Sequence, residues 1–134
     1  MSRAVFLDTS AIFAITDRGD HSHQRTLDTY KRAQRFVTHF GIFLEAFSLI
    51  SKRISKPVAL DVIQRFRASP RIESVLIDGD LLEAGWRRAA KFRDKEWDWI
   101  DCVSFELMER RGIQEALTHD HHFRQAGFTI LPET

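Results

Sequence analysis

Four acidic residues lie where the sequence predicts that a strand gives way to a helix. They are Asp8, Glu45, Asp101 and Asp120. An apolar run ends directly before each of them or one or two residues earlier. In an open parallel α/β sheet, the carboxyl ends of the strands line one crevice, and ligands bind there. We therefore expect four carboxylates that are distant in sequence to meet in space.

Carboxylates gathered in one crevice destabilise a fold unless a cation compensates their charge. Two carboxylates about 5 Å apart repel by roughly 3 kcal/mol at an effective dielectric constant of about 20. Without compensation, some of the four would take up protons. Mg²⁺ suits such a site because it binds through a few carboxylates and keeps several waters, and Mn²⁺ also accepts oxygen ligands. A divalent ion bound here would activate water and stabilise the charge that develops on a phosphodiester.

The bulk composition is compatible with this chemistry and decides little about it. The chain has 134 residues, of which 43% are apolar, and its formal net charge is +1. This length predicts a single domain over residues 1–134 with one core. No apolar run approaches membrane-spanning length, so we expect no membrane partner. The single cysteine, Cys102, cannot form an internal disulfide, which favours a reducing cytosol and a cytoplasmic protein.

Strands and helices are predicted to alternate along the chain. The predicted strands cover residues 4–7, 36–38, 72–77, 115–118 and 128–131. The predicted helices cover residues 9–15, 23–33, 43–53, 56–67, 98–110 and 120–125, with a further helix that is capped by Asp78 or Asp80 and ends near residue 92. This alternation favours an α/β fold with a central parallel sheet of four to five strands and helices on both faces.

With the four acids placed, the sequence resembles the PIN-domain family, and within it the VapC-type toxin ribonucleases of type II toxin–antitoxin pairs. The resemblance covers nearly the whole chain. It is carried by Leu7-Asp8-Thr9-Ser10-Ala11, Leu44-Glu45, Trp99-Ile100-Asp101-Cys102-Val103-Ser104-Phe105, and Leu117-Thr118-His119-Asp120-His121-His122-Phe123 with Gly127. Each motif alone is weak, whereas all four in this order are specific together.

The resemblance implies a three-layer α/β/α PIN-like fold and a metal-dependent endoribonuclease that cleaves RNA phosphodiester bonds. The four acidic positions of the family fall on Asp8, Glu45, Asp101 and Asp120, which would be catalytic and would hold Mg²⁺ or Mn²⁺. A homodimer and a VapB-like antitoxin partner are also implied. Two alternatives stay open: a housekeeping RNA-processing PIN nuclease without an antitoxin, and a non-catalytic PIN-like module that binds RNA or protein.

Polar neighbours of the acids have more than one interpretation. Asp98 lies three residues before Asp101, so on a helix the two share a face and Asp98 becomes a further metal ligand. Alternatively, Asp98 caps that helix. The hydroxyl groups of Thr9, Ser10 and Thr118 are expected to orient an acid or a water rather than to bind the metal.

The run His119-Asp120-His121-His122 has the composition of a transition-metal site. We expect neighbouring side chains at a strand–helix junction to point in different directions, which argues against zinc. His122 and Phe123 resemble a common variant of the last motif of the PIN-domain family, which implies that His122 packs or contacts RNA.

Basic and aromatic residues precede Asp101. The basic ones are Arg87, Arg88, Lys91, Arg93 and Lys95. A solvated helix face is the simplest interpretation of each, but the cluster as a whole could steer phosphate toward the acids. Trp97 and Trp99 could stack on bases, although packing in the core or in a dimer is the favoured use of at least one.

Overall fold

The computed structural model describes residues 3–133 and contains a five-stranded sheet in which every pair of neighbouring strands is parallel. The strands are β1 (Ala4–Leu7), β2 (Arg35–His39), β3 (Ile72–Val75), β4 (Glu115–Leu117) and β5 (Thr129–Leu131). Their order across the sheet is β3-β2-β1-β4-β5, so β1 lies at the centre. Because the strands run in one direction, their carboxyl ends meet at one edge.

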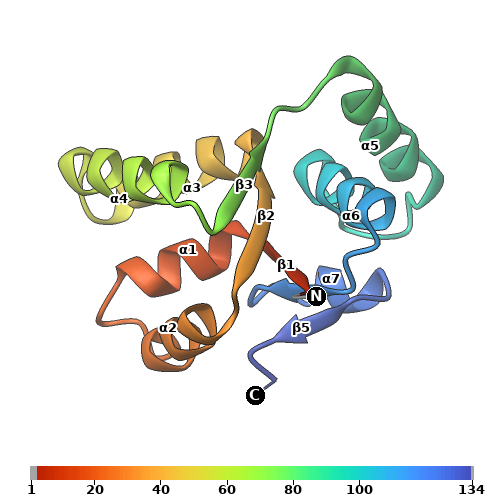
Figure 1. Cartoon of the computed structure of the whole chain (residues 1–134). Helices are drawn as coiled ribbons and strands as arrows, with labels where there is room; N and C mark the ends of the chain where they lie inside the picture. Colours follow the sequence, from red (N-terminus) through yellow and green to blue (C-terminus); the bar gives the residue numbers. More distant parts are fainter. Residues whose placement is uncertain (1–2, 134) are drawn as a thin grey trace.

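Helices pack on both faces of this sheet. They are α1 (Thr9–Thr16), α2 (His23–Arg32), α3 (Phe40–Arg53), α4 (Lys56–Ala68), α5 (Gly79–Lys91), α6 (Trp99–Arg111) and α7 (His122–Gln125). Figure 1 shows α1 to α4 on one side of β2 and β3, with α5 and α6 on the other. This arrangement confirms the predicted three-layer α/β/α fold. Between residues 3 and 133, no helix combines the length and apolarity that crossing a membrane requires.

Aromatic side chains fill the space between the sheet and the helices α6 and α7. Phe6 of β1, Phe105 of α6 and Phe123 of α7 are fully buried. The ring centroid of Phe123 lies 5.8 Å from that of Phe6 and 5.0 Å from that of Phe105. Trp97 is buried as well and packs on Phe105, as expected for one of the two tryptophans. These contacts fix α6 and α7 against the central strand.

Several helix ends lie where the sequence predicts them. The side chain of Ser55 accepts a hydrogen bond from the backbone N of Val58 at 3.2 Å. Asp78, rather than Asp80, caps α5 by accepting from the backbone N of Leu81 at 2.8 Å. Gly112 ends α6 with a φ of 65°, a left-handed conformation that glycine adopts at the lowest cost.

Three element boundaries differ from the prediction by two or three residues, and the other differences are of one residue. Helix α3 begins at Phe40 rather than at residue 43, β3 ends at Val75 rather than at residue 77, and α7 begins at His122 rather than at residue 120. The early start of α3 includes Gly41, a residue type that is unfavourable inside helices. Gly41 fits here because a Cβ at this position would lie only 2.8 Å from Cε1 of the buried His39 ring.

The contact between α5 and α6 depends on a glycine. A Cβ on Gly85 would lie 2.6 Å from Cγ2 of Val103 and 3.0 Å from its backbone N. We therefore expect Gly85→Ala to lower the free energy of unfolding by about 1–2 kcal/mol, because overpacking outweighs the better helix propensity of alanine. Urea unfolding measures this difference.

Gly79→Ala is the matched control, since Gly79 lies in the same helix and nothing surrounds its Cβ position within 4 Å. We expect its stability to equal or exceed that of the wild type. A Gly85→Ala variant as stable as Gly79→Ala would contradict the close approach of α5 and α6.

Candidate active site

The four predicted acids come from four different parts of the fold. Asp8 follows β1 directly, Asp120 lies between β4 and α7, and Asp101 is in the first turn of α6. Glu45 is in the second turn of α3, because this helix starts earlier than predicted, so Glu45 does not mark a strand–helix junction. In addition to burial, the carboxylates of Glu45 and Asp120 raise the pKa of Asp8, and the carboxylate of Asp120 raises that of Asp101. The structure thus brings all four acids together.

Asp8 lies deepest among these acids, with 6% of its surface exposed. Its backbone carbonyl begins α1, but its side chain makes no capping hydrogen bond, so simple capping does not explain this residue. The pKa of Asp8 is raised to about 6, chiefly by burial and also by the carboxylates of Glu45 and Asp120, while hydrogen bonds from Thr118 and the Thr9 backbone act in the opposite direction. Asp8 is therefore a carboxylate whose charge lacks compensation.

Two hydroxyl groups hold the Asp8 carboxylate. Thr118 donates to Asp8 Oδ2 at 2.7 Å and Ser10 donates to the same oxygen at 3.2 Å. Both hydroxyls also accept backbone hydrogen bonds from the loop after β4: Asp120 N donates to Thr118 at 3.0 Å, and His119 N donates to Ser10 at 2.9 Å. The register of β1 and β4 places Asp8 and Thr118 side by side. The hydroxyls thus orient the acid, as the sequence predicts.

Glu45 is oriented in the same way. Thr9 Oγ1 donates to Glu45 Oε1 at 2.5 Å and so connects α1 to α3. Burial raises the pKa of Glu45, and the carboxylates of Asp98 and Asp120 add to this rise. A half-buried glutamate that faces two further acids fits a cation site.

Asp98 and Asp101 form a reciprocal cap at the start of α6. Asp98 Oδ1 accepts from Asp101 N at 2.8 Å, and Asp101 Oδ2 accepts from Asp98 N at 3.2 Å. This capping box satisfies two backbone N–H groups that a helix start leaves unpaired. The capping interpretation of Asp98 is thus confirmed, while its side chain also lies close enough to raise the pKa of Asp101.

His122 contacts the acids directly, which the sequence analysis missed. Its Nδ1 lies 3.0 Å from Asp101 Oδ2 and 3.3 Å from Asp120 Oδ1. Burial, followed by the charges of Asp98 and Asp120, raises the pKa of Asp101 to about 7, and the His122 contact lowers it only in part. Nothing in the sequence places His122 beside the acids, so only the position of α7 could reveal this contact.

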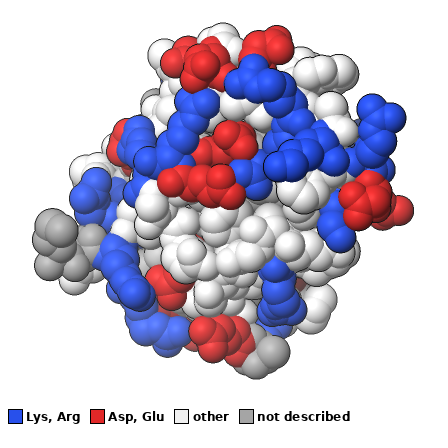
Figure 2. All heavy atoms as spheres, turned by 90° about the vertical axis from the view of Figure 1, so that its right-hand side faces the viewer, with Lys and Arg blue, Asp and Glu red and all other residues white. Residues whose placement is uncertain are grey.

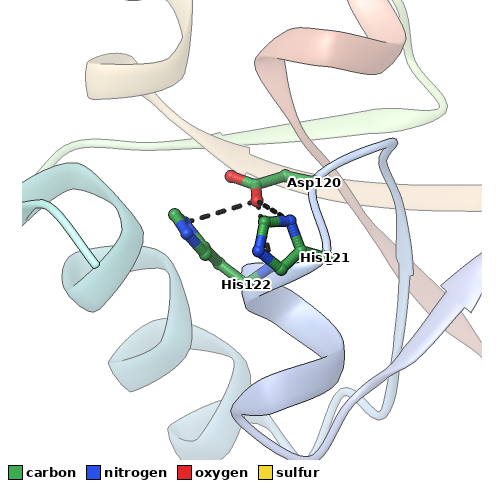
Figure 3. A group of neighbouring side chains, drawn as sticks. All are labelled: Asp120, His121 and His122. Atoms are coloured by element: carbon green, nitrogen blue, oxygen red, sulfur yellow. Dashed lines mark hydrogen bonds and ion pairs between the residues drawn. The ribbon is translucent and has the colours of Figure 1, made fainter. Parts of the chain in front are cut away.

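Asp120, His121 and His122 form a compact group of possible metal ligands. Their ligand atoms all lie within 4.8 Å of one another. Figure 3 shows both imidazole rings turned toward the Asp120 carboxylate. The expected divergence of neighbouring side chains is wrong for these two histidines. It holds for His119, whose Nε2 instead lies 2.8 Å from Thr26 Oγ1 on α2.

The donor set fits a hard divalent cation. Four carboxylates supply oxygen atoms, and in the described chain no Lys or Arg is among the groups that set the pKa values of Asp8, Glu45 and Asp101. The raised pKa values mean that negative charge is held here at a cost. Oxygen ligands in this number suit Mg²⁺ or Mn²⁺.

The predicted basic cluster is only partly available to a ligand. Arg88 forms ion pairs of 2.6 Å with both Glu106 and Glu109. Together with Arg87 and Lys91, these residues line a cleft of about 450 Å³ between α5 and α6. Figure 2 shows Lys and Arg side chains around a group of acidic side chains on this face. The acidic residues weaken the attraction of the cleft for phosphate, so a solvated face explains most of the cluster.

The chain is similar to known proteins in both sequence and structure. A family model described as PIN domain matches residues 5–129. The 23S rRNA-specific endonuclease VapC20 of Mycobacterium tuberculosis is 28% identical over 131 residues, which cover 96% of this chain and 99% of that protein. A crystal structure of the same VapC20, titled as a sarcin–ricin loop cleaving toxin, superposes with a TM-score of 0.87 and 25% identity over 93% of this chain and 96% of that chain.

A more distant structural neighbour is VapBC2 from Rickettsia felis bound to a DNA fragment from its promoter. It has a TM-score of 0.68 and 12% identity over 95% of this chain and 96% of that chain, and it supports the fold alone. Together, the matches confirm the family, the fold and the nuclease class that the sequence analysis predicts.

The cost of the buried Asp8 charge can be measured as stability. The pKa of Asp8 in the folded chain is about 6, above its usual 3.8, so folding favours the protonated form and stability falls as pH rises through this window. In EDTA, we expect Asp8→Asn to be more stable than the wild type by up to about 3 kcal/mol at neutral pH.

This advantage should fall below about 1 kcal/mol near pH 4, where Asp8 is protonated in the folded state and close to half protonated in the unfolded state. Urea unfolding of both proteins from pH 4 to pH 8 measures the difference, and titrating groups distant from Asp8 cancel because the two chains share them. An advantage that is absent at neutral pH, or equal at all pH values, would contradict an uncompensated charge at Asp8.

Proposed function

We propose that this chain, which belongs to the PIN-domain family, is a divalent-metal-dependent endoribonuclease and the toxin of a toxin–antitoxin pair. The observation that carries the proposal is the convergence of Asp8, Glu45, Asp101 and Asp120 from four separate elements. A cluster of this kind costs stability and has no evident structural benefit, so a function must maintain it.

In this proposal, Asp8, Glu45, Asp101 and Asp120 hold one or two Mg²⁺ or Mn²⁺ ions. When bound, the metal activates water and stabilises the charge on the phosphodiester. Asp98 fixes the first turn of α6, and its second oxygen can accept from a water in the site. Thr9, Ser10 and Thr118 hold the carboxylates in place through the hydrogen bonds described above.

We infer that the substrate is a structured RNA of the large ribosomal subunit. VapC20, a 23S rRNA-specific endonuclease, is similar over nearly the whole of both chains and superposes with a TM-score of 0.87. The acidic crevice itself recognises phosphate only through a bound cation, so selectivity among RNAs must arise from the surrounding surface.

Cleavage of ribosomal RNA tests this proposal directly. We expect the purified protein to cut large-subunit rRNA with Mg²⁺ or Mn²⁺ and not in EDTA. Loss of a group that only orients a metal ligand typically lowers activity 10–100-fold, so loss of a ligand in Asp8→Asn or Asp101→Asn should lower it by at least about 100-fold.

Asp61→Asn is the control for this experiment, because Asp61 is exposed on α4 and forms an ion pair with Arg65. It should cleave like the wild type. Full activity of Asp8→Asn and Asp101→Asn in Mg²⁺ would refute the assignment of the site. An inert wild type would favour the non-catalytic module instead.

A VapB-like antitoxin would neutralise the acidic crevice with a basic side chain. Arginine suits this role because its planar fork pairs with carboxylates through two hydrogen bonds. An apolar groove of about 260 Å³ between α3 and α4, lined by Phe43, Leu44, Phe47 and Leu60 among others, offers a place for the rest of such a segment. Leu44 is 71% exposed and Leu60 is 55% exposed, so the groove presents apolar surface.

We expect expression of this chain alone to stop growth, and co-expression of an adjacent small gene to restore it. Asp101→Asn is the control, since it should be harmless on its own and still bind the partner through the apolar groove. Normal growth with soluble wild-type protein would contradict the toxin function and favour a housekeeping nuclease.

The proposed homodimer has a candidate surface on α5 and α6. Trp86 and Trp99 contact each other with ring centroids 5.0 Å apart, and Trp99 Nε1 donates to the backbone O of Leu82 at 2.9 Å. All three side chains are more than a third exposed. Such a patch typically marks an interface.

We expect the wild type to sediment as a dimer and Trp86→Glu to sediment as a monomer with an unchanged circular dichroism spectrum. A monomeric wild type would contradict the dimer and favour stacking of RNA bases on this patch.

A further inference from the structure

A buried histidine links the two halves of the acid cluster. His39 is the last residue of β2 and the N-cap of α3, and none of its surface is exposed. Its Nε2 lies 2.8 Å from Oγ of Ser104, which is fully buried in α6. A histidine is seldom fully buried, so its presence in the core calls for a reason.

The protonation of this pair follows from its neighbours. Ser104 Oγ donates its single proton to the backbone O of Ile100 at 3.0 Å, so it can only accept from His39. His39 is therefore the donor, with its proton on Nε2. Burial lowers the pKa of His39 to about 4, which keeps the imidazole neutral at physiological pH. The Nδ1 atom is buried without a hydrogen-bond partner, a cost that the fold accepts for this contact.

The pair belongs to the two segments of the chain that carry Glu45 and Asp101. His39 precedes Glu45 by six residues, and Ser104 follows Asp101 by three, about one helical turn. Glu45 and Asp101 belong to α3 and α6, which lie on opposite sides of the sheet in Figure 1. Among residues 3–133, this is the only hydrogen bond between segment 35–53 and α6. It therefore connects the two helices that carry acids from opposite layers.

Like charges act against this connection. The Asp98 carboxylate at the start of α6 adds to the effect of burial in raising the pKa of Glu45 on α3, so the two helix ends repel each other. This repulsion favours movement of the helices apart, and a shift of a few tenths of an ångström already spoils the spacing that an ion with strict octahedral geometry demands.

We propose that His39 and Ser104 are positioning residues whose hydrogen bond holds Glu45 and Asp101 at the separation that binds the divalent ion. The inference rests on the proposed function, because it assigns the pair a role at that metal site. Gly41 belongs to the same arrangement, since its missing side chain leaves room for the His39 ring: a Cβ there would lie 2.9 Å from Nδ1.

Titration calorimetry with Mn²⁺ tests the proposal without relying on activity. Ser104→Ala and His39→Leu remove the hydrogen bond from either end, and each should weaken Mn²⁺ binding about 10-fold or more. The double variant should bind no more weakly than the weaker single one, because both remove the same interaction. His39→Gln keeps an amide donor and should bind close to the wild type. Gly41→Ala displaces the ring while keeping both partners and should weaken binding.

A control variant that loses stability elsewhere in the core distinguishes the positioning of metal ligands from general damage to the core. Ile63→Val truncates a buried side chain of α4, a helix that carries none of the four acids, and should leave Mn²⁺ binding unchanged. In rRNA cleavage, Ser104→Ala should require more Mg²⁺ for half-maximal rate, while its KM for RNA stays that of the wild type.

Wild-type Mn²⁺ affinity in both Ser104→Ala and His39→Leu would overturn the inference, as would an equal loss of affinity in Ile63→Val. A wild type that binds Mn²⁺ but cleaves no RNA would refute the proposed nuclease function and leave this inference standing.

Discussion

Repulsion among carboxylates at one edge of the sheet is the constraint on which the arrangement of this site depends. A flexible chain would relieve it by moving the acids apart. Here Asp8 follows the central strand, and Asp101 lies on a helix that Phe105 anchors in the aromatic core. Packing at interior density resists such movement. Burial, together with the repulsion that persists, therefore raises the pKa of Asp8 to about 6 and that of Asp101 to about 7.

Neutral hydroxyl groups hold the acids in place without neutralising their charge. Ser10 and Thr118 satisfy an oxygen of Asp8, and Thr9 does the same for Glu45. A hydroxyl donates one hydrogen bond and brings no net charge, so it orients a carboxylate and leaves its charge available. A lysine or arginine in the same place would form a salt bridge and remove the affinity for a metal. The small polar residues around the acids thus have a specific electrostatic role.

The sequence predicts the strand-end acids better than the rest of the site. Asp8 and Asp120 follow short apolar runs, and the rule that parallel strands end at one edge places them together. The sequence analysis expects Glu45 at the start of a helix, yet α3 begins at Phe40. Gly41 makes this first turn unfavourable by helix propensity, and tertiary packing overrides that propensity. The contacts of His122 and His39 depend on how separate helices dock, which no local pattern encodes.

Under the proposed function, binding of the activating metal and binding of the inhibiting antitoxin both relieve the same repulsion among the carboxylates. The excess negative charge is fixed by the fold, and one bound cation relieves most of it. A second cation then meets a site that is already compensated and gains much less. A divalent ion and the arginine of an antitoxin therefore compete for the crevice even if they contact different oxygen atoms. The outcome of this competition depends on the difference between the two binding free energies. The apolar groove between α3 and α4 gives an antitoxin additional binding free energy that the ion lacks.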